Sequence, residues 1–131
     1  LDNFKTINDT HGHAAGDRLL REVASRLTGH LGGTGIACRL SGDEFMVIMP
    51  ETSSTAALKA AERLRRNVSS AAFETNAGSL AFSISVGVAS LNKSCKTLAH
   101  LLERADYASY VSKDSGGNRV TRWTRSITRD R

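Results

Sequence analysis

The chain has 131 residues, 40% of them apolar, which is typical of one compact domain with a single hydrophobic core. Its apolar runs are far shorter than the roughly 20 residues of a membrane-spanning helix, so we expect a soluble, cytoplasmic domain that reaches a membrane only through other parts of its protein. Four of its five net positive charges fall in residues 115–131, which indicates a basic tail or linker and argues against nucleic-acid binding.

The spacing of apolar residues predicts three helices. The first covers residues 16–31, where a leucine or valine recurs every four residues. The second follows the cap residues 52–54 and carries its apolar side as far as Val68. The third runs over residues 97–113 and ends before a glycine pair, with these residues expected to face inward: Leu98, Leu101, Leu102, Ala105 and Ala108.

Strand patterns occupy residues 36–40, 43–49, 80–91 and 118–123. The order helix, strand, strand, helix, strand, helix, strand predicts an α+β domain in which helices pack on a sheet with antiparallel strands. We expect a first strand to be clipped at the N-terminus. The expected domain covers residues 1–123, and residues 124–131 are expected to form the basic tail.

The stretch RLSGDEF, residues 39–45, predicts a hairpin turn at Ser41–Gly42. Simple antiparallel register then pairs Arg39 with Glu44. The same register places four residues on one apolar face: Ile36, Cys38, Phe45 and Val47.

Two adjacent carboxylates, Asp43 and Glu44, stand beside this turn. Like charges repel, and neither side chain helps to pack a core, so the pair is suited to holding a cation. Mg²⁺ prefers oxygen ligands from one or two carboxylates together with substrate phosphates. The alternative is a solvated hairpin in which Glu44 pairs with Arg39, and the turn alone does not separate these interpretations.

A second polar cluster is LDNFKTINDTHGHAAGD, residues 1–17, with two glycines before the first predicted helix. A carboxylate and a carboxamide together can match the hydrogen-bonding edge of guanine. Exposed backbone N–H groups near a lysine suit phosphates. For any single residue of the cluster, a role in a turn or a helix cap is the simpler interpretation.

Together these two stretches resemble the GGDEF domain of bacterial diguanylate cyclases, and the resemblance continues through ISVGVAS, residues 84–90, and RADYASYVSKDSGGN, residues 104–118. It implies a fold like the nucleotide cyclase catalytic domain, a ferredoxin-like palm with a mainly antiparallel sheet and packed helices. It also implies a signal-transduction transferase that joins two GTP into cyclic di-GMP with release of two pyrophosphates. Each domain of a facing homodimer would present one GTP.

The resemblance also assigns roles to residues. Asn8 and Asp17 would read guanine. Asp43 would ligate Mg²⁺, or Mn²⁺ in its place, and help to deprotonate the attacking hydroxyl. Glu44 would lie beside it, and the Leu1 carbonyl would be another metal ligand. The remaining substrate contacts would come from Asn3, Phe4, Lys5, His13, Ser41, Gly42 and Lys113.

The chain departs from the family pattern at four places. Gly117 stands where the family often has a phosphate-binding arginine, which should weaken triphosphate binding. Residues 32–35 read GGTG where the product-inhibition motif R-x-x-D would end, so we expect no feedback binding of cyclic di-GMP there. Ser41 replaces the first motif glycine and, if forced to positive φ, would cost about 1 kcal/mol, so it should tune activity. The first metal-binding aspartate of the family would stand immediately before Leu1.

Two functions from different classes follow. The first is a diguanylate cyclase domain, favoured by the motif residues that the chain retains. The second is a degenerate GGDEF domain that binds GTP and regulates an attached sensory or phosphodiesterase domain, or mediates protein contacts. The loss of the arginine and the altered turn favour this second function.

Overall fold

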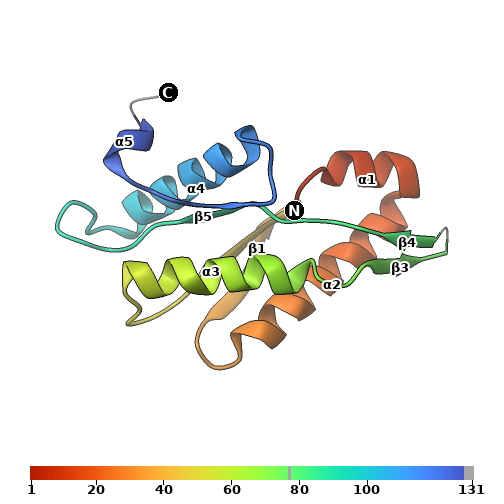
Figure 1. Ribbon diagram of the computed structural model, residues 1–131, viewed down its shortest axis with the longest axis horizontal. Coiled ribbons are helices and arrows are strands. Elements are labelled where there is room, and N and C mark those ends of the chain that lie inside the picture. The colour runs from red at the N-terminus through yellow and green to blue at the C-terminus, as the bar shows by residue number, and fades with distance from the viewer. Residues whose placement is uncertain (77, 129–131) are drawn as a thin grey trace.

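The computed structural model describes residues 1–76 and 78–128 (Figure 1). Its helices are α1 (Phe4–His11), α2 (His13–Leu31), α3 (Ser54–Val68), α4 (Leu98–Asp114) and α5 (Arg125–Thr128). Its strands are β1 (Ile36–Ser41), β2 (Glu44–Ile48), β3 (Phe73–Thr75), β4 (Gly78–Leu80), β5 (Val86–Val88) and β6 (Val120–Arg122). No helix among the described residues is long and apolar enough to cross a membrane.

The strands form three two-stranded sheets, and the predicted α+β class is confirmed. β1 pairs with β2 and β3 pairs with β4 in antiparallel fashion, while β5 and β6 are parallel. Figure 1 shows α3 on one side of β5 and α4 on the other. The strand predicted over residues 80–91 is shorter than expected, since regular pairing in the structure covers Gly78–Leu80 and Val86–Val88.

The hydrophobic core lies between α2, α3 and the strands. The predicted apolar stripe of α2 is confirmed, because each of its leucines and its valine is at most 5% exposed. The core residues are Leu1, Ile7, Leu19, Leu20, Val23, Leu27, Leu31, Leu64, Val68, Phe82 and Ile84. Leu1 and Ile7 belong to this cluster, so the core itself fixes the segment on which the candidate site is built.

The predicted inner face of α4 is wrong at two positions. Leu98 is 66% exposed and Leu102 is 38% exposed. The predicted burial of Ala108 is confirmed, and the helix also buries Tyr107 and Ser112. Its backbone packs directly on Gly87, where any Cβ would collide with main-chain atoms of α4. Close approach of two backbones requires small residues, so the contact surface of α4 is set by its small residues rather than by its leucines.

The β1–β2 hairpin turns one residue later than predicted. Ser41 pairs with Glu44, so the turn residues are Gly42 and Asp43, and the pairing shifts between Arg39 and Ser41. Gly42 has φ of 52°, as the first central residue of a type II′ turn requires. Ser41 ends β1 and does not have positive φ, so the backbone cost expected for serine there does not arise.

This shift turns the opposite face of β1 toward the apolar face of β2, because side chains alternate along a strand. The predicted apolar face is confirmed for Phe45 and Val47, which pack against the core, and is wrong for Ile36 and Cys38, which are exposed. The predicted pairing of Arg39 with Glu44 is wrong as well. Arg39 lies opposite Phe45, and its Nε donates to the Gly42 carbonyl at 2.9 Å.

Three elements were not expected from the sequence: α1, the β3–β4 hairpin and the short helix α5. α1 turns into α2 at Gly12, which has φ of 89° and donates its N–H to the Asn8 carbonyl at 2.8 Å. In the predicted tail, α5 contacts α4 through Tyr107, whose hydroxyl donates to the Ile127 carbonyl at 3.0 Å. The remainder of that tail, residues 129–131, lies outside the described residues.

Candidate functional site

Three segments that are distant in the sequence meet at Leu1 and Asp2. The Leu1 nitrogen donates to the Asp43 carbonyl of the hairpin turn at 3.4 Å. The Asp2 N–H donates to the Ser83 carbonyl at 2.9 Å. The Asp2 carboxylate accepts the N–H of Asn118, which follows the end of α4, also at 2.9 Å. The hairpin turn with Asp43 and the turn after Lys113 are therefore both joined to the segment that precedes α1, near the middle of the molecule (Figure 1).

The Asp2 carboxylate is the most highly connected polar group at this point. Its Oδ2 accepts from the Ser83 hydroxyl at 2.6 Å and from the Asn118 N–H, and its Oδ1 accepts from the Ser85 hydroxyl at 2.6 Å. Burial opposes ionisation and is the largest single influence on the pKa of Asp2. The hydrogen bonds from Ser83, Ser85 and Asn118 together outweigh it and lower the pKa.

The hairpin turn presents Asp43, which is half-buried, and Glu44, which is exposed. Leu1 lies beside this turn, where its nitrogen donates to the Asp43 carbonyl, and the turn offers two carboxylates as a set of oxygen donors. Such a set suits Mg²⁺, which keeps several waters and is commonly held by one or two carboxylates with substrate phosphates. Within residues 1–76 and 78–128, no group of three or more His, Cys, Asp or Glu side chains forms a protein-only metal site.

Asn8 lies at the contact between α1 and α2, whereas Asp17 is exposed on α2. The Asn8 carboxamide lies against Gly16, the residue before Asp17, where a Cβ would collide with Asn8 Oδ1. Asn8 Oδ1 is buried without a hydrogen-bond partner. Buried polar atoms are normally paired, so this oxygen marks unused hydrogen-bonding capacity at the predicted guanine-reading position.

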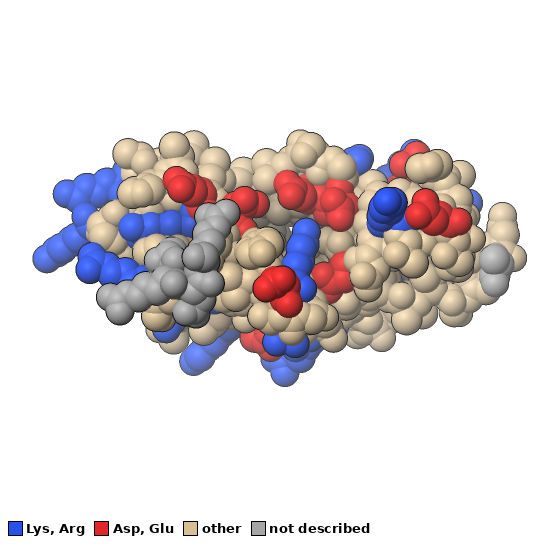
Figure 2. Space-filling view, turned by 90° about the horizontal axis from the view of Figure 1, so that it is seen from above, with Lys and Arg blue, Asp and Glu red and all other residues tan. Residues whose placement is uncertain are grey.

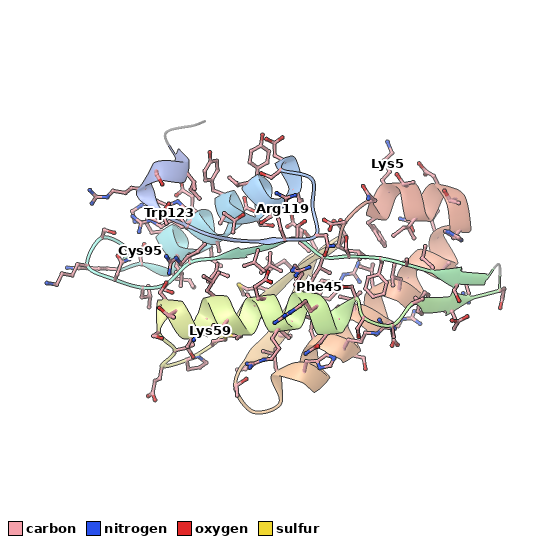
Figure 3. The ribbon with its side chains drawn as sticks, viewed as in Figure 1. Lys5, Phe45, Lys59, Cys95, Arg119 and Trp123 are labelled. Atoms are coloured by element: carbon pink, nitrogen blue, oxygen red, sulfur yellow. The ribbon has the colours of Figure 1, made fainter. Side chains whose placement is uncertain are left out.

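The start of α1 offers backbone donors. Its cap residue Asn3 has φ of 56° and makes no side-chain cap. The first N–H groups of a helix have no partner within the helix and attract anions, so the N–H groups of Phe4 and Lys5 are available to phosphate. The Lys5 side chain extends away from the body of the protein (Figure 3).

Lys113 and His13 are the other predicted contacts that lie outside the junction itself. Lys113 is exposed in the last turn of α4, directly before the turn that ends on Asp2. His13 is the first residue of α2 and is also exposed. Of these two, the structure links only Lys113 to the junction, through Asn118.

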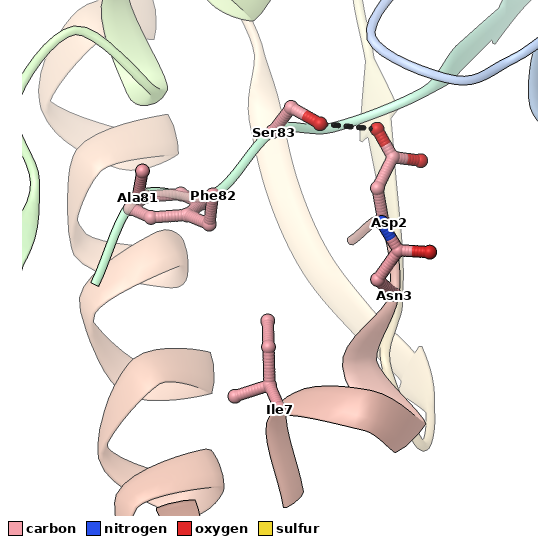
Figure 4. A pocket seen from close by; sticks show the side chains of 6 residues that line it. All are labelled: Asp2, Asn3, Ile7, Ala81, Phe82 and Ser83. Carbon is pink, nitrogen blue, oxygen red and sulfur yellow. Dashed lines mark hydrogen bonds between the residues drawn. The ribbon is translucent and has the colours of Figure 1, made fainter. Parts of the chain in front are cut away.

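A pocket of about 310 Å³ opens beside the junction (Figure 4). It is lined by Asp2, Asn3, Ile7, Ala81, Phe82 and Ser83. The sequence reasoning missed this pocket and the serine pair on Asp2, because their residues lie some eighty positions apart in the chain. The alternation of apolar and polar residues over 82–88 was the sequence signal for the serine pair, because it places the two serines on the face opposite Phe82 and Ile84.

Charge is unevenly distributed on the face that carries α4 and α1. Figure 2 shows basic side chains gathered at the end near the C-terminal segment and acidic side chains along the middle. The visible face therefore has no continuous basic stripe of the kind that follows a nucleic-acid backbone.

Comparison with known proteins places this geometry in a family. Residues 1–119 match the family model described as "Diguanylate cyclase, GGDEF domain". Diguanylate cyclase A of Treponema denticola is 42% identical over 121 residues, which are 92% of this chain and 33% of that protein. Response regulator PleD of Caulobacter vibrioides is 44% identical over 122 residues, covering 92% of this chain and 27% of PleD. The chain thus spans a third or less of these relatives.

Solved structures agree with the sequence comparisons. The GGDEF domain of TpbB (YfiN) from Pseudomonas aeruginosa superposes with a TM-score of 0.89 at 32% identity, covering 98% of this chain and 76% of that one. The GGDEF domain of DgcB from Caulobacter crescentus, solved in complex with c-di-GMP, gives 0.85 at 35% identity, covering 92% and 70%. The motifs, the fold and these relatives lead to one conclusion: the chain belongs to the GGDEF family of diguanylate cyclase domains.

Proposed function

We propose that this chain is the catalytic domain of a diguanylate cyclase that condenses two GTP into cyclic di-GMP. The observation that carries the proposal is the junction at Leu1 and Asp2. There the hairpin turn with Asp43, the start of α1 and the turn after Lys113 are connected by direct hydrogen bonds. A chain that used these motif residues only as surface caps would have no need to bring them to one point.

The proposed roles follow from the chemistry of each group. The Asn8 carboxamide and the Asp17 carboxylate bind the guanine edge, which needs one acceptor for its ring and amino N–H groups and one donor for its carbonyl. The N–H groups at the start of α1 and the ammonium groups of Lys5 and Lys113 bind phosphates. His13, Ser41 and Gly42 line the approach to this nucleotide.

Asp43 and Glu44, with the Leu1 carbonyl, would hold Mg²⁺ or Mn²⁺. When bound, such an ion neutralises charge on the phosphates and aligns the displacement. In this proposal Asp43 also accepts the proton of the attacking 3′-hydroxyl. The new bond joins O3′ to the α-phosphorus of the other GTP, the α–β phosphoanhydride bond breaks, and pyrophosphate leaves with that electron pair.

One domain supplies half of the reaction centre in this scheme. The product contains two phosphodiester bonds, and each α-phosphate must meet the 3′-hydroxyl of the other nucleotide. A second copy of the domain facing the first therefore completes the site, and segments of the longer protein, sensory or phosphodiesterase in kind, would control that pairing.

A regulatory domain is the second candidate, and Gly117 favours it. A Cβ at this position would lie 3.2 Å from the Asp2 carboxylate, and Gly117 has φ of 75°. The turn is therefore built around glycine and offers no cationic side chain toward a triphosphate. In this alternative the domain binds GTP weakly and regulates an attached domain without turnover.

The two candidates are separated by comparing the protein, extended at its N-terminus, with its Asp43→Asn variant in GTP and Mg²⁺. The proposal predicts cyclic di-GMP from the parent protein, detected by chromatography, and none from the variant, with equal melting temperatures. GTP binding without product at high protein concentration supports the regulatory domain. Equal turnover by the two proteins would show that Asp43 is not at the reaction centre.

A further inference from the structure

The turn that follows α4 is held at its end by Asp2 rather than by its own backbone. The N–H groups of Ser115, Gly116 and Gly117 donate back to carbonyls of the helix at 3.0 to 3.2 Å. The next N–H, that of Asn118, donates instead to Asp2 Oδ2 at 2.9 Å. Asn118 has φ of 50°, so the chain reverses at this residue and must be held in a sparsely populated conformation.

The surroundings leave the Asp2 carboxylate little freedom. The hydroxyls of Ser83 and Ser85 occupy its other hydrogen-bonding positions at 2.6 Å each. Gly117 approaches so closely that a Cβ there would lie 3.2 Å from Oδ2. The Asn118 side chain is held separately, since its Oδ1 accepts from Arg65 of α3 at 2.9 Å. A carboxylate that accepts hydrogen bonds from three donors in this way serves the structure as a hydrogen-bond acceptor.

We propose that Asp2 is a positioning residue, a latch that fixes the C-terminal end of α4, and with it Lys113, against the phosphate-binding start of α1. This inference rests on the proposed function, because it gives Lys113 and the first N–H groups of α1 a shared ligand. Asp2 acts through its shape and its acceptor atoms. Its negative charge and any metal ligation play no part in this role.

Two substitutions separate shape from charge. Asp2→Asn keeps the length of the side chain: its amide oxygen accepts from Asn118 and Ser83, and its NH₂ group donates to the Ser85 hydroxyl. Asp2→Glu keeps the charge but adds a methylene where Gly117 leaves no room. Ser85→Ala is the matched control, because it removes one hydrogen bond, of 2.6 Å, from the same carboxylate without touching the turn after α4.

The test measures KM and kcat for GTP in the N-terminally extended protein with Mg²⁺. We expect Asp2→Glu to raise KM by about tenfold or more, the effect of losing roughly one hydrogen bond. The KM values of Asp2→Asn and Ser85→Ala should stay within about threefold of the parent value, which is a smaller change than the loss of one such hydrogen bond would cause. The reverse order, with Asp2→Glu active and Asp2→Asn impaired, would overturn the latch and indicate a role for the charge.

Hydrogen exchange of the Asn118 amide tests the latch independently of turnover. We expect at least about tenfold faster exchange in Asp2→Glu than in the parent, because the amide loses its acceptor, and parent-like exchange in Asp2→Asn and Ser85→Ala. A parent protein that neither binds nor converts GTP would refute the proposed function, while the exchange rates would still decide the latch. Unchanged protection in Asp2→Glu would refute the latch whatever the enzyme does.

Discussion

Substitution of Gly16 by alanine should damage the nucleotide site while leaving the fold largely intact. A methyl group at Gly16 would collide with Asn8 Oδ1 and lie 3.0 Å from its Cγ and 3.3 Å from Phe4 Cζ. The Asn8 carboxamide is the far end of a side chain, so it can move, and Gly16→Ala should displace it. The group that we propose reads guanine would then leave its position at the contact between α1 and α2.

The magnitude follows from two opposing effects. Alanine gains about 1 kcal/mol over glycine inside a helix, whereas overpacking costs about 1–3 kcal/mol. Gly29→Ala on the same helix is the matched control, because a Cβ there has no atom within 4 Å. We therefore expect Gly29→Ala to stabilise the protein by about 1 kcal/mol, and Gly16→Ala to be about 1–3 kcal/mol less stable than that control.

Thermal unfolding and titration with a fluorescent GTP analogue measure these effects. About 1 kcal/mol corresponds to a shift of roughly 4 °C in Tm for a domain of this size. Losing the hydrogen bonds of Asn8 should weaken GTP binding by about tenfold, with little change for an ATP analogue. If Gly16→Ala gains as much stability as Gly29→Ala and binds GTP like the parent, the reasoning about Asn8 is wrong.

Three further predictions concern the fold. Gly87→Ala should destabilise the protein by about 2–4 kcal/mol in urea unfolding, because main-chain atoms of α4 cannot move aside; an unchanged midpoint would contradict this. Leu98→Ala should cost under about 0.5 kcal/mol and Leu19→Ala about 2–5 kcal/mol, since the former is 66% exposed and the latter fully buried. Hydrogen bonds from Arg65 lower the pKa of Glu62 from its ordinary 4.5. Ionised Glu62 should therefore add at most about a few tenths of a kcal/mol to the free energy of unfolding above that pH, and this stabilisation should be lost below it. Equal stability of Glu62→Gln and the parent protein from pH 3 to 7 would show that ionised Glu62 makes no such contribution.

The sequence predicted the core of α2 well because a single stripe of large apolar residues repeats at helical spacing. It failed on α4 because that helix meets β5 through small residues, and burial by close backbone approach leaves no apolar stripe. Leu98 and Leu102 follow the helical period, yet they are exposed. Periodicity shows which residues share a face but not which face a neighbouring element covers.

The hairpin shows a second limit. The turn was predicted at Ser41–Gly42, and one additional residue before the turn was enough to exchange the faces of β1 while β2 kept its predicted face. A bulge of this kind leaves little local signal, because the glycine that takes positive φ is present in either arrangement. The prediction that the carboxylates beside the turn hold a cation does not depend on this register, and it stays a prediction.

The candidate site was predictable in its members but not in its connections. The motif residues could be named from their order in the chain. The link between Asp2 and Asn118 could not, because it joins opposite ends of the sequence through one side chain and one backbone N–H. Such a contact depends on the folded path of every element between the two residues.

The measurement that tests the central claim most directly is the rate of cyclic di-GMP formation per domain as protein concentration rises. The N-terminally extended protein would be incubated with GTP and Mg²⁺, and the nucleotides separated by chromatography. A domain that supplies half of a reaction centre predicts a rate per domain that increases with concentration until pairing is complete. No cyclic di-GMP at any concentration would contradict the cyclase function, and a rate per domain that does not depend on concentration, down to the lowest protein level that can be assayed, would contradict the facing pair.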